Sequence, residues 1–353
     1  MKPCPLELIG CGALGEQVYA PVLAHLERTG RVKVTGLVEP AEARRRKVAQ
    51  IFPAARAVAR IEELPANSEA LAVIASPPGV HAAQACALLA GGRHVLCEKP
   101  LAMTVAEAEA MVAAAQQAHR LLAAGMMRRF YLPTQALREN LLAGTFGEPQ
   151  QIEVVEGGKF GWGAASPKFF EPANGGVLFD LGSHALDLLC HWFGAPAATE
   201  SWNDASGGAN TNCVLTAQWP AGLRARVRLS WDTANLPSGW RLKTSRGECR
   251  WNGHADGVVA FRPHGGGWWL QAAPQTSPFA ADPKNLSSWP ATFVRQFENV
   301  LGALAGRNSL LAPAAEVLPS LRWLESAQRH AQPLLQPWLS ATEQDRAIAL
   351  AKP

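Results

Sequence analysis

Short apolar segments alternate with alanine-rich helical segments through residues 1–125, and this alternation limits the fold more than any other feature of the sequence. Between two of the apolar segments, Thr104 and Glu107 have the spacing of a capping box, which predicts a helix ending near residue 119. Strands that alternate with helices form a parallel sheet covered by helices. We therefore expect an α/β, doubly wound N-terminal domain over residues 1–125, with strands at 6–9, 32–38, 71–75, 94–97 and 121–124.

The second half of the chain has a different pattern, and all 12 tryptophans lie from Trp162 onward. Ser245, Arg246 and Gly247 give a hairpin signal between two short strands, which is typical of antiparallel or mixed sheets. Helices are predicted at 133–143, 176–193, 291–305 and 314–330. Strands are predicted at 153–156, 214–219, 223–231, 241–244, 248–251 and 258–261. We expect an α+β domain over residues 126–353, whose C-terminal helices are candidates for packing back on the first domain.

Composition excludes several classes of protein. The net charge of +4 over 353 residues comes from dispersed Lys and Arg, without the basic block of a nucleic-acid-binding protein. Seven cysteines without a C-x-x-C pair argue against a disulfide framework and a zinc ribbon. No apolar run reaches the roughly 18 residues of a membrane span, and the N-terminus does not resemble a signal peptide. We expect a cytoplasmic protein without nucleic-acid or membrane partners.

Three glycines, Gly10, Gly12 and Gly15, follow the first predicted strand directly and open a helix, with Ala13 and Leu14 between them. Missing Cβ atoms allow a tight turn and a close approach of the backbone to a pyrophosphate, and the helix N-terminus favours the anion. Glu39 ends the next strand, 24 residues after Gly15, where its carboxylate can accept hydrogen bonds from a ribose. This arrangement predicts dinucleotide binding; a glycine turn that serves only packing is the alternative.

The identity of the dinucleotide depends on charges after the second strand. Glu39 would repel the 2′-phosphate of NADP, whereas Arg44, Arg45 and Arg46 could reach back to bind it. A solvated helix face is the alternative reading of the three arginines. We expect NAD or NADP as cofactor, with NAD favoured.

Two further segments lie at predicted strand ends, where a doubly wound sheet presents its ligands. The first contains Ser76, Pro77, Pro78 and His81, and it suits a rigid turn before a helix as well as a cofactor contact. The second ends in Glu98, Lys99 and Pro100. An ammonium group at that position can hydrogen-bond a substrate oxygen and stabilise negative charge on it, and Pro100 would fix its direction through a trans or a cis peptide bond.

In the second half, Asp180 and His184 stand four residues apart in a predicted helix, so they share one face. Asp180 can orient His184, both can point into one cleft, or the two can be an incidental surface pair. Asp187, Cys190 and His191 lie nearby but fan around the helix, and they give no compact ligand set. We therefore expect no metal site.

These motifs together resemble the glucose-fructose oxidoreductase and inositol dehydrogenase family, Gfo/Idh/MocA. The resemblance rests on G-C-G-A-L-G, S-P-P-G-V-H, G-G-R-H-V-L-C-E-K-P, M-R-R-F and G-G-V-L-F-D-L-G-S-H-A-L-D. It covers residues 6 to about 195 and continues more weakly to about 330. Two positions depart from the family pattern: Asn174, where members often have a third glycine, and Glu39, where many have Asp.

The resemblance implies a Rossmann domain and a second domain with a large open, mostly antiparallel sheet, whose exposed face makes a homodimer or homotetramer. It also implies Lys99, Asp180 and His184 as catalytic residues, with Glu98 and His81 near the nicotinamide. His184 would accept the proton of a secondary hydroxyl while hydride leaves the same carbon. The implied activity is NAD(P)-dependent hydride transfer to or from a sugar, cyclitol or related polyol. The alternatives are an NAD-dependent glycosidase and a non-catalytic cofactor-binding regulator.

Candidate substrate residues lie between a second-domain strand and the helix of His184. Aromatic faces suit the C–H surfaces of a sugar ring, and lysines can bind hydroxyls or a carboxylate. Arg128 and Arg129 suit a salt bridge and a cleft contact equally, and at least one of Phe169 and Phe170 is expected in the core. The tryptophans of the strands, such as Trp219, Trp231, Trp240 and Trp251, are expected to build the sheet and an oligomer interface rather than a sugar platform. The substrate candidates are Arg128, Lys159, Phe160, Trp162 and Lys168.

Overall fold

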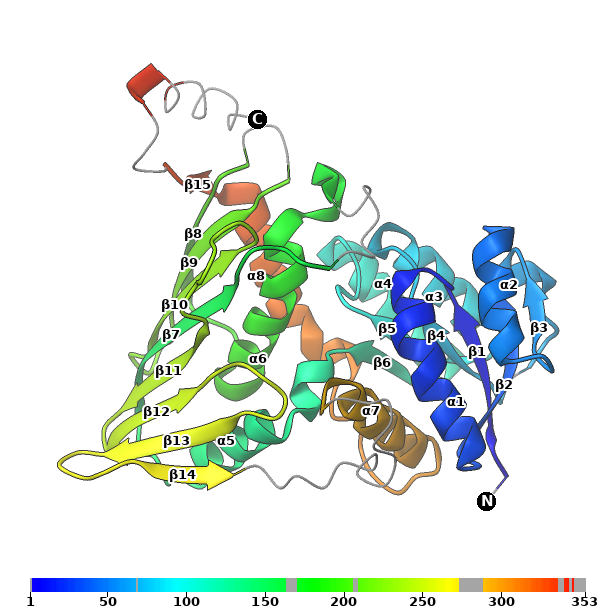
Figure 1. Ribbon diagram of the computed structural model, residues 1–353, viewed down its shortest axis with the longest axis horizontal. Helices are drawn as coiled ribbons and strands as arrows, with labels where there is room; N and C mark the ends of the chain where they lie inside the picture. Colours follow the sequence, from blue (N-terminus) through cyan, green and yellow to red (C-terminus); the bar gives the residue numbers. More distant parts are fainter. Residues whose placement is uncertain are drawn as a thin grey trace. The chain divides into compact units, whose positions relative to one another are not determined.

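The computed structural model describes residues 2–67, 69–162, 170–205, 209–272, 288–335, 340–342 and 345. The chain divides into two compact units (Figure 1). The first consists of Met1–Met127 and Ser277–Leu318, and the second of Arg128–Thr276 and Pro319–Pro353. Within the described residues, no helix is long and apolar enough to span a membrane.

The first unit contains a parallel sheet, and its described strands have the order β3-β2-β1-β4-β5-β6. The strand order reverses between β1 and β4, which is the switch point where doubly wound sheets bind ligands. The α/β, doubly wound prediction is confirmed. The sequence missed β3, which has three residues, two of them exposed. The strands are β1 (Cys4–Ile9), β2 (Val32–Val38), β3 (Arg56–Val58), β4 (Leu71–Ile74), β5 (His94–Glu98) and β6 (Leu122–Gly125).

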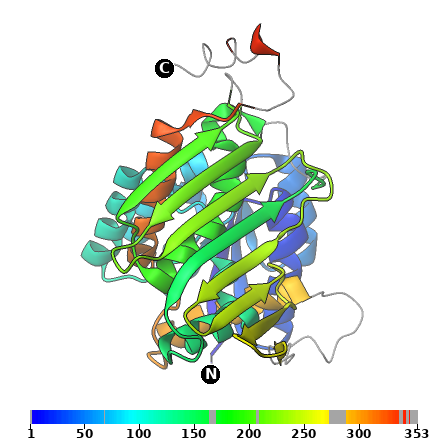
Figure 2. The ribbon, with the colours of Figure 1, turned by 90° about the vertical axis from the view of Figure 1, so that its left-hand side faces the viewer.

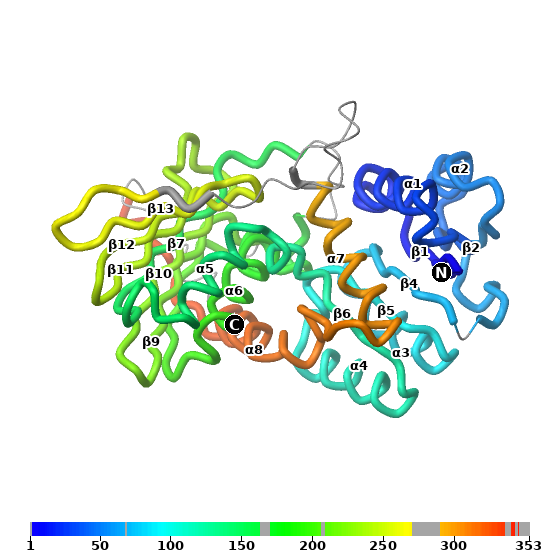
Figure 3. The backbone as a smooth tube through the Cα atoms, turned by 90° about the horizontal axis from the view of Figure 1, so that it is seen from below, coloured from blue at the N-terminus to red at the C-terminus, as the bar shows by residue number. Residues whose placement is uncertain are grey.

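The helices of the first unit include one from the C-terminal part of the chain. Thr104 and Glu107 form the predicted capping box, with Thr104 Oγ1 3.2 Å from Glu107 N and Glu107 Oε2 3.1 Å from Thr104 N. Phe293 and Phe297 of α7 pack edge-to-face on Tyr19. Figure 3 shows α7 beside α1. The helices are α1 (Ala20–Arg28), α2 (Glu42–Ile51), α3 (His81–Ala90), α4 (Val105–Ala118) and α7 (Ser288–Leu304).

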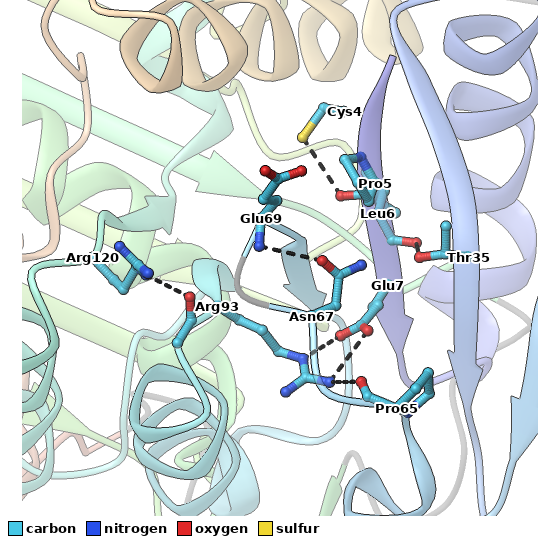
Figure 4. A network of polar contacts seen from close by, with 11 residues as sticks. Cys4, Pro5, Leu6, Glu7, Thr35, Pro65, Asn67, Glu69, Arg93 and Arg120 are labelled. Atoms are coloured by element: carbon cyan, nitrogen blue, oxygen red, sulfur yellow. Dashed lines mark hydrogen bonds and ion pairs between the residues drawn. The ribbon is translucent and has the colours of Figure 1, made fainter. Parts of the chain in front are cut away.

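A buried ion pair supports the amino-terminal side of this sheet. Glu7, in β1, is 2% exposed, and Arg93 donates to its carboxylate through Nε at 2.6 Å. Arg93 also donates to the carbonyl oxygen of Pro65 at 2.7 Å (Figure 4). Removing one partner of such a pair leaves an uncompensated buried charge, so this contact holds β1 beside the segments that precede β4 and β5.

The second unit contains a mixed sheet with the described strand order β14-β13-β12-β11-β7-β10-β9-β8-β15 (Figure 2). The pairs β7–β10 and β8–β15 are parallel and the other pairs are antiparallel, which confirms the mostly antiparallel prediction. The sequence missed β8, β14 and β15. The strands are β7 (Pro149–Gly157), β8 (Ala198–Asn203), β9 (Asn212–Gln218), β10 (Arg224–Ser230), β11 (Gly239–Thr244), β12 (Gly247–Trp251), β13 (Val258–Pro263), β14 (Trp269–Ala272) and β15 (Gln332–Pro333).

Tryptophans line the inner face of this sheet, beneath α5 (Leu132–Leu142), α6 (Ser183–Phe193) and α8 (Ala314–His330). Trp192 of α6 packs edge-to-face on Trp240, and Trp323 of α8 on Trp219. The interpretation that the strand tryptophans form an oligomer interface is wrong, because they are buried within the chain. They are 3–6% exposed: Trp219, Trp231, Trp240 and Trp251.

The segment before α6 is not the regular helix that the sequence predicted over 176–193. Residues 176–177 are α-helical, Leu178–Gly182 form a π-helical turn, and the regular α-helix follows over Ser183–Phe193. Gly176, with φ +61°, precedes the turn, and a Cβ there would collide with the backbone of Asn210. The predicted bounds of 176–193 therefore hold, but the helix contains a π turn near its start, where its backbone lies against Asn210.

Candidate active site

The three glycines after β1 meet three different requirements. Gly10 has φ +99°, and a Cβ there would lie 2.7 Å from the backbone nitrogen of Ser76. A Cβ on Gly15 would collide with the carbonyl oxygen of Gly10. A Cβ on Gly12 would meet nothing within 4 Å. Gly10 and Gly15 thus form the turn itself, whereas Gly12 borders the open space that a pyrophosphate needs.

Glu39, directly after β2, is 8% exposed, and its carboxylate connects the glycine turn to the start of α2 by hydrogen bonds. Its Oε2 accepts from the backbone N–H of Cys11 and its Oε1 from that of Ala41, both at 3.0 Å. This structural role was missed from the sequence. A carboxylate has further lone pairs, so the same group can still accept from a ribose hydroxyl.

The arginines of α2 differ in their contacts. Arg45 Nη1 donates to the carbonyl oxygen of Glu39 at 2.5 Å, and Arg46 pairs with Glu42 at 2.6 Å. Arg44 is exposed. Two of the three guanidinium groups are therefore engaged locally, which leaves Arg44 as the better candidate for contact with a phosphate.

His81 connects the two predicted strand-end segments. Its side chain is fully buried, with Nε2 2.9 Å from the carbonyl oxygen of Ser76 and Nδ1 2.9 Å from that of Pro100. Burial lowers the pKa of His81, although the carbonyl contacts oppose this effect. Ser76 Oγ donates to Gln84 at 2.5 Å, and Pro77 and Pro78 follow before α3. His81 thus holds the Ser76–Pro78 turn against the segment that follows Lys99.

Glu98 ends β5 as a buried carboxyl group, 4% exposed. It accepts from the Tyr19 hydroxyl at 2.6 Å and from the backbone N–H of Lys99 at 2.9 Å. Burial raises the pKa of Glu98. The Lys99–Pro100 peptide bond is cis. Because the carboxyl ends of parallel strands meet at one edge of a sheet, the first unit gathers the glycine turn, Glu39, Ser76 and Lys99 at that edge.

Asp180 lies in the π-helical turn of the second unit, and His184 lies in the first turn of α6, 9% exposed. The indole N–H of Trp231 donates to Asp180 Oδ2 at 3.2 Å. Single π turns recur at functional sites because they redirect side chains. Lys99 belongs to the first unit and Asp180 and His184 to the second, so their common action is part of the proposal below.

Asn210 was missed from the sequence and anchors this turn. It is 1% exposed, its carbonyl oxygen accepts from Val177 N at 2.9 Å, and its Oδ1 accepts from Leu178 N at 3.0 Å. No local sequence signal marks it, because it contacts the turn from more than 30 residues away.

The arginines near the start of the second unit form ion pairs. Arg129 and Asp187 make a bidentate pair at 2.9 and 2.7 Å, each side chain 1% exposed. Arg128 Nη1 lies 2.5 Å from both carboxylate oxygens of Glu156, which also accepts from Trp240 Nε1 at 2.7 Å. Arg128 therefore makes the salt bridge that was one of its two predicted roles. No group of three metal-ligating side chains occurs in the described part of the chain.

The candidate substrate segment is described in part. Lys159 and Trp162 are exposed, the latter by 40%. The ring of Phe160 packs edge-to-face on Phe170 and Trp231 at centroid distances of 5.0 and 5.5 Å. Phe170 is 43% exposed and therefore not a core residue. Lys168 and Phe169 lie outside the described residues.

Comparison with known proteins decides the family. Residues 6–126 match the model described as "Oxidoreductase family, NAD-binding Rossmann fold", and residues 134–250 match the GFO/IDH/MocA C-terminal domain. The chain belongs to the GFO/IDH/MocA oxidoreductase family. The resemblance noted from the sequence motifs is confirmed.

Several characterised proteins share part of this GFO/IDH/MocA chain. D-glucoside 3-dehydrogenase of Escherichia coli (strain K12) is 34% identical over 154 residues, which is 41% of this chain and 42% of the relative. 1,5-anhydro-D-fructose reductase of Ensifer adhaerens is 34% identical over 38% of this chain and 41% of the relative. The NADP+-dependent scyllo-inositol 2-dehydrogenase of Bacillus subtilis (strain 168) is 28% identical over 54% and 52%. The chain thus spans about half or less of the length of these relatives.

Solved structures show the same fold over most of the chain. An oxidoreductase domain protein from Kribbella flavida has a TM-score of 0.81 at 20% identity, covering 94% of this chain and 97% of that one. An oxidoreductase from Agrobacterium radiobacter, in complex with NAD+, L-tartaric acid and magnesium, has a TM-score of 0.79 at 19% identity, covering 93% and 96%. The family's two-domain fold therefore extends over more than nine tenths of this chain.

Proposed function

We propose that this protein is an NAD(P)-dependent oxidoreductase that transfers a hydride between the nicotinamide cofactor and a secondary hydroxyl or ketone of a sugar, cyclitol or related polyol. The observation that carries the proposal is the glycine turn at the switch point, where Gly12 borders open space, together with Lys99, which follows β5 at the same edge of the sheet. The family supports the same conclusion, because its N-terminal model is an NAD-binding Rossmann fold.

The first unit would hold the cofactor. Gly12, Ala13 and Leu14 would meet the pyrophosphate at the helix N-terminus, with Gly10 and Gly15 shaping the turn. Glu39 would accept from the adenosine ribose, and Ser76–Pro78, His81 and Glu98 would shape the nicotinamide end. When bound, NAD(P) accepts or returns the hydride at its nicotinamide ring.

The choice between NAD and NADP follows from the charges around β2. Glu39 has a carboxylate at the edge of the glycine turn, and two of the three neighbouring arginines are engaged in local contacts. A 2′-phosphate would thus meet a negative group and depend mainly on Arg44. This supports NAD as the favoured cofactor, with NADP as the alternative.

Lys99 and His184 would act on the reacting oxygen. The Lys99 ammonium would donate a hydrogen bond to that oxygen and stabilise the negative charge on it. His184 would accept the hydroxyl proton during oxidation and return it during reduction, because an imidazole titrates near neutral pH. Asp180 would orient His184 or bind a neighbouring hydroxyl.

The rest of the substrate would be contacted by the segment before α6, through Lys159, Phe160, Trp162 and Lys168. Arg128 would act through its ion pair with Glu156.

Relatives support a sugar or cyclitol substrate. The names of the first two relatives refer to a glucoside and an anhydro-sugar, and that of the third to an inositol. The two faces of the second unit's sheet would serve different purposes: the tryptophan-lined face builds the core, and the open face would form a homo-oligomer. The seven free cysteines support a reducing compartment such as the cytoplasm.

The direct test is a screen of sugars and cyclitols with NAD+ and NADP+, in which reduction is monitored by the absorbance of the nicotinamide.

The residue roles are tested with the substrate that this screen finds. Lys99→Ala and His184→Ala should each lower turnover by about 100-fold or more, because general acid–base groups contribute about 10²–10⁴-fold. Lys243→Ala and His264→Ala, which remove exposed side chains of the same types, are the controls. Turnover within about tenfold of wild type in both catalytic variants would refute the assigned roles. Release of a leaving group without net NAD(P)H would instead indicate the glycosidase.

A further inference from the structure

Trp231 and Trp240 differ from Trp219 and Trp251, because their indole N–H groups donate to a carboxylate, that of Asp180 and that of Glu156 respectively. The indole N–H groups of Trp219 and Trp251 donate to backbone carbonyls, of Gly194 at 2.8 Å and of His254 at 3.0 Å. Trp231 Nε1 instead donates to the carboxylate of Asp180 at 3.2 Å. Trp231 is 6% exposed, so this hydrogen bond is largely shielded from water.

The backbone around Trp231 is also fixed. Its N–H donates to the carbonyl oxygen of Thr211 at 2.8 Å, and its carbonyl oxygen accepts from Phe160 N at 2.6 Å. Trp231 directly follows β10, so the indole is attached to a central strand of the sheet. A rigid donor held in this way restricts the rotamers of the carboxylate it contacts.

The same indole belongs to a cluster of three rings. Phe160, Phe170 and Trp231 pack mutually edge-to-face, with centroid distances of 5.0, 5.5 and 5.8 Å. Phe170 is 43% exposed, so the cluster presents one apolar ring to solvent, and Trp231 connects this ring to the Asp180 carboxylate. A pyranose ring has the complementary character, since its axial C–H groups form an apolar face and its hydroxyls form a polar rim.

We propose that Trp231 is a positioning residue for Asp180, and that the exposed ring of Phe170, packed on Phe160 and Trp231, forms a subsite for the C–H face of a pyranoside ring whose hydroxyl reaches Asp180. This inference rests on the proposed function, because it takes Asp180 as part of the active site. It adds how the sugar is held: the apolar ring of Phe170 suits the C–H face of a pyranoside, while the Asp180 carboxylate accepts from one of its hydroxyls.

The first test reads the hydrogen bond without any substrate. In protein with ¹⁵N-labelled indoles, the Trp231 signal is assigned as the one missing from Trp231→Phe. Asp180→Asn should shift that signal and leave the Trp251 signal in place. An unmoved Trp231 signal in Asp180→Asn would overturn the positioning role.

The second test reads the subsite by ligand NMR with methyl β-D-glucopyranoside and NAD+. Saturation of the aromatic protein protons should transfer mainly to the axial ring protons on one face of the sugar, and Phe170→Ala should abolish most of it. Leu142→Ala, which removes a side chain exposed by 70% at the end of α5, is the matched control. Absence of transfer in the wild type, or equal transfer in Phe170→Ala, would overturn the subsite.

Steady-state kinetics then separate the positioning role of Trp231 from the sugar subsite. Trp231→Phe keeps a ring in the cluster but loses the N–H, so kcat should fall by about tenfold or more with little change in KM for NAD+. Trp251→Phe loses an indole hydrogen bond of the same kind and should retain kcat. Equal loss in both variants would show that Trp231 is merely structural. If the wild type binds NAD+ and reduces it with other polyols but shows no transfer from the pyranoside, the subsite fails while the proposed function stands.

Discussion

At the scale of single residues, residues of the same type have different physical roles in the structure. Gly10, Gly12 and Gly15 belong to one motif, yet two of them are required by the backbone and one borders open space. Glu39 and Glu98 are both candidate cofactor residues, yet each also satisfies backbone N–H groups inside the protein. Stability and binding can therefore be separated by the choice of position.

Gly12→Ala and Gly15→Ala should separate these effects. Gly12→Ala should change the free energy of unfolding by less than about 0.5 kcal/mol but weaken NAD+ binding, because its methyl group enters space that the cofactor needs. Gly15→Ala should destabilise the protein by several-fold more, because its methyl group meets the Gly10 carbonyl oxygen. Urea unfolding and calorimetric NAD+ titration measure the two effects. Undiminished NAD+ affinity in Gly12→Ala would contradict the assignment of the turn.

The hydrogen bond from Tyr19 to Glu98 should give a pH-dependent stability. Burial raises the pKa of Glu98, and the Tyr19 hydroxyl opposes this shift. Deprotonation of Glu98 therefore costs stability as pH rises above 4.5, and Tyr19→Phe should increase that cost. We expect the variant to lose about 1–3 kcal/mol, with a larger loss at about pH 8 than at about pH 5.

Glu98→Gln provides the control for this prediction, since it removes the titrating group. In the Glu98→Gln background, the effect of Tyr19→Phe should no longer depend on pH. A pH-dependent effect that persists in this background would assign the titration to another group.

At the scale of helices and strands, the sequence predicted the elements whose signals lie within their own residues. The capping box of Thr104 and the 32–38 strand agree with the structure because their signals are local. The π turn of Leu178–Gly182 was predicted as ordinary helix, because Asn210, which accepts hydrogen bonds from the backbone at its start, is distant in sequence. Strands β8 and β15 were missed because their pairing partners, more than their composition, define them.

The candidate site shows the same division between local and distant signals. Gly12, Lys99, Asp180 and His184 could be named from motifs, since the family resemblance fixes their spacing. The contact of Trp231 with Asp180 joins segments 51 residues apart and leaves no mark in either one. Sequence reasoning therefore finds the candidate reacting groups and misses the side chains that orient them.

Helix α6 should carry a pH-dependent stability of its own. Burial, followed by the positive charges of Arg129 and Arg138, lowers the pKa of His191 to about 3. Because the unfolded chain takes up this proton near pH 6.5 and the folded chain does not, stability should fall as pH drops from 6.5 toward about 3. His191→Gln should flatten this fall. Thermal midpoints at about pH 7 and about pH 4.5 test it, with His264→Gln as control; equal slopes in wild type and His191→Gln would contradict the assignment.

At the scale of the whole molecule, the open face of the second sheet carries a row of positive charges. Arg224, Arg226 and Arg228 alternate along β10 as exposed residues, and Glu153 pairs across from Arg226 in β7. Such a row of opposite charges can pair with a second copy of itself across a two-fold axis. This face thus supports the proposed homo-oligomer, although the tryptophans take no part in it.

Reversal of this charge should weaken self-association. We expect wild-type protein to sediment as a dimer or larger oligomer, and Arg226→Glu to dissociate more readily because it would face Glu153 of the same row and of the second copy. Arg246→Glu, at the β11–β12 turn outside that row, is the control. A monomeric wild type, or equal association in both variants, would contradict an interface on this face.

The most direct test of the account follows the hydride itself. A polyol or sugar that reduces NAD(P)+ in the screen is prepared with deuterium on the carbon that bears the reacting hydroxyl, and the reduced nicotinamide is analysed by mass spectrometry. The account predicts that the deuterium appears in the reduced cofactor, at a rate lowered at least about 100-fold in His184→Ala. Failure of every sugar and cyclitol to reduce the cofactor, or loss of the deuterium to water, would contradict it.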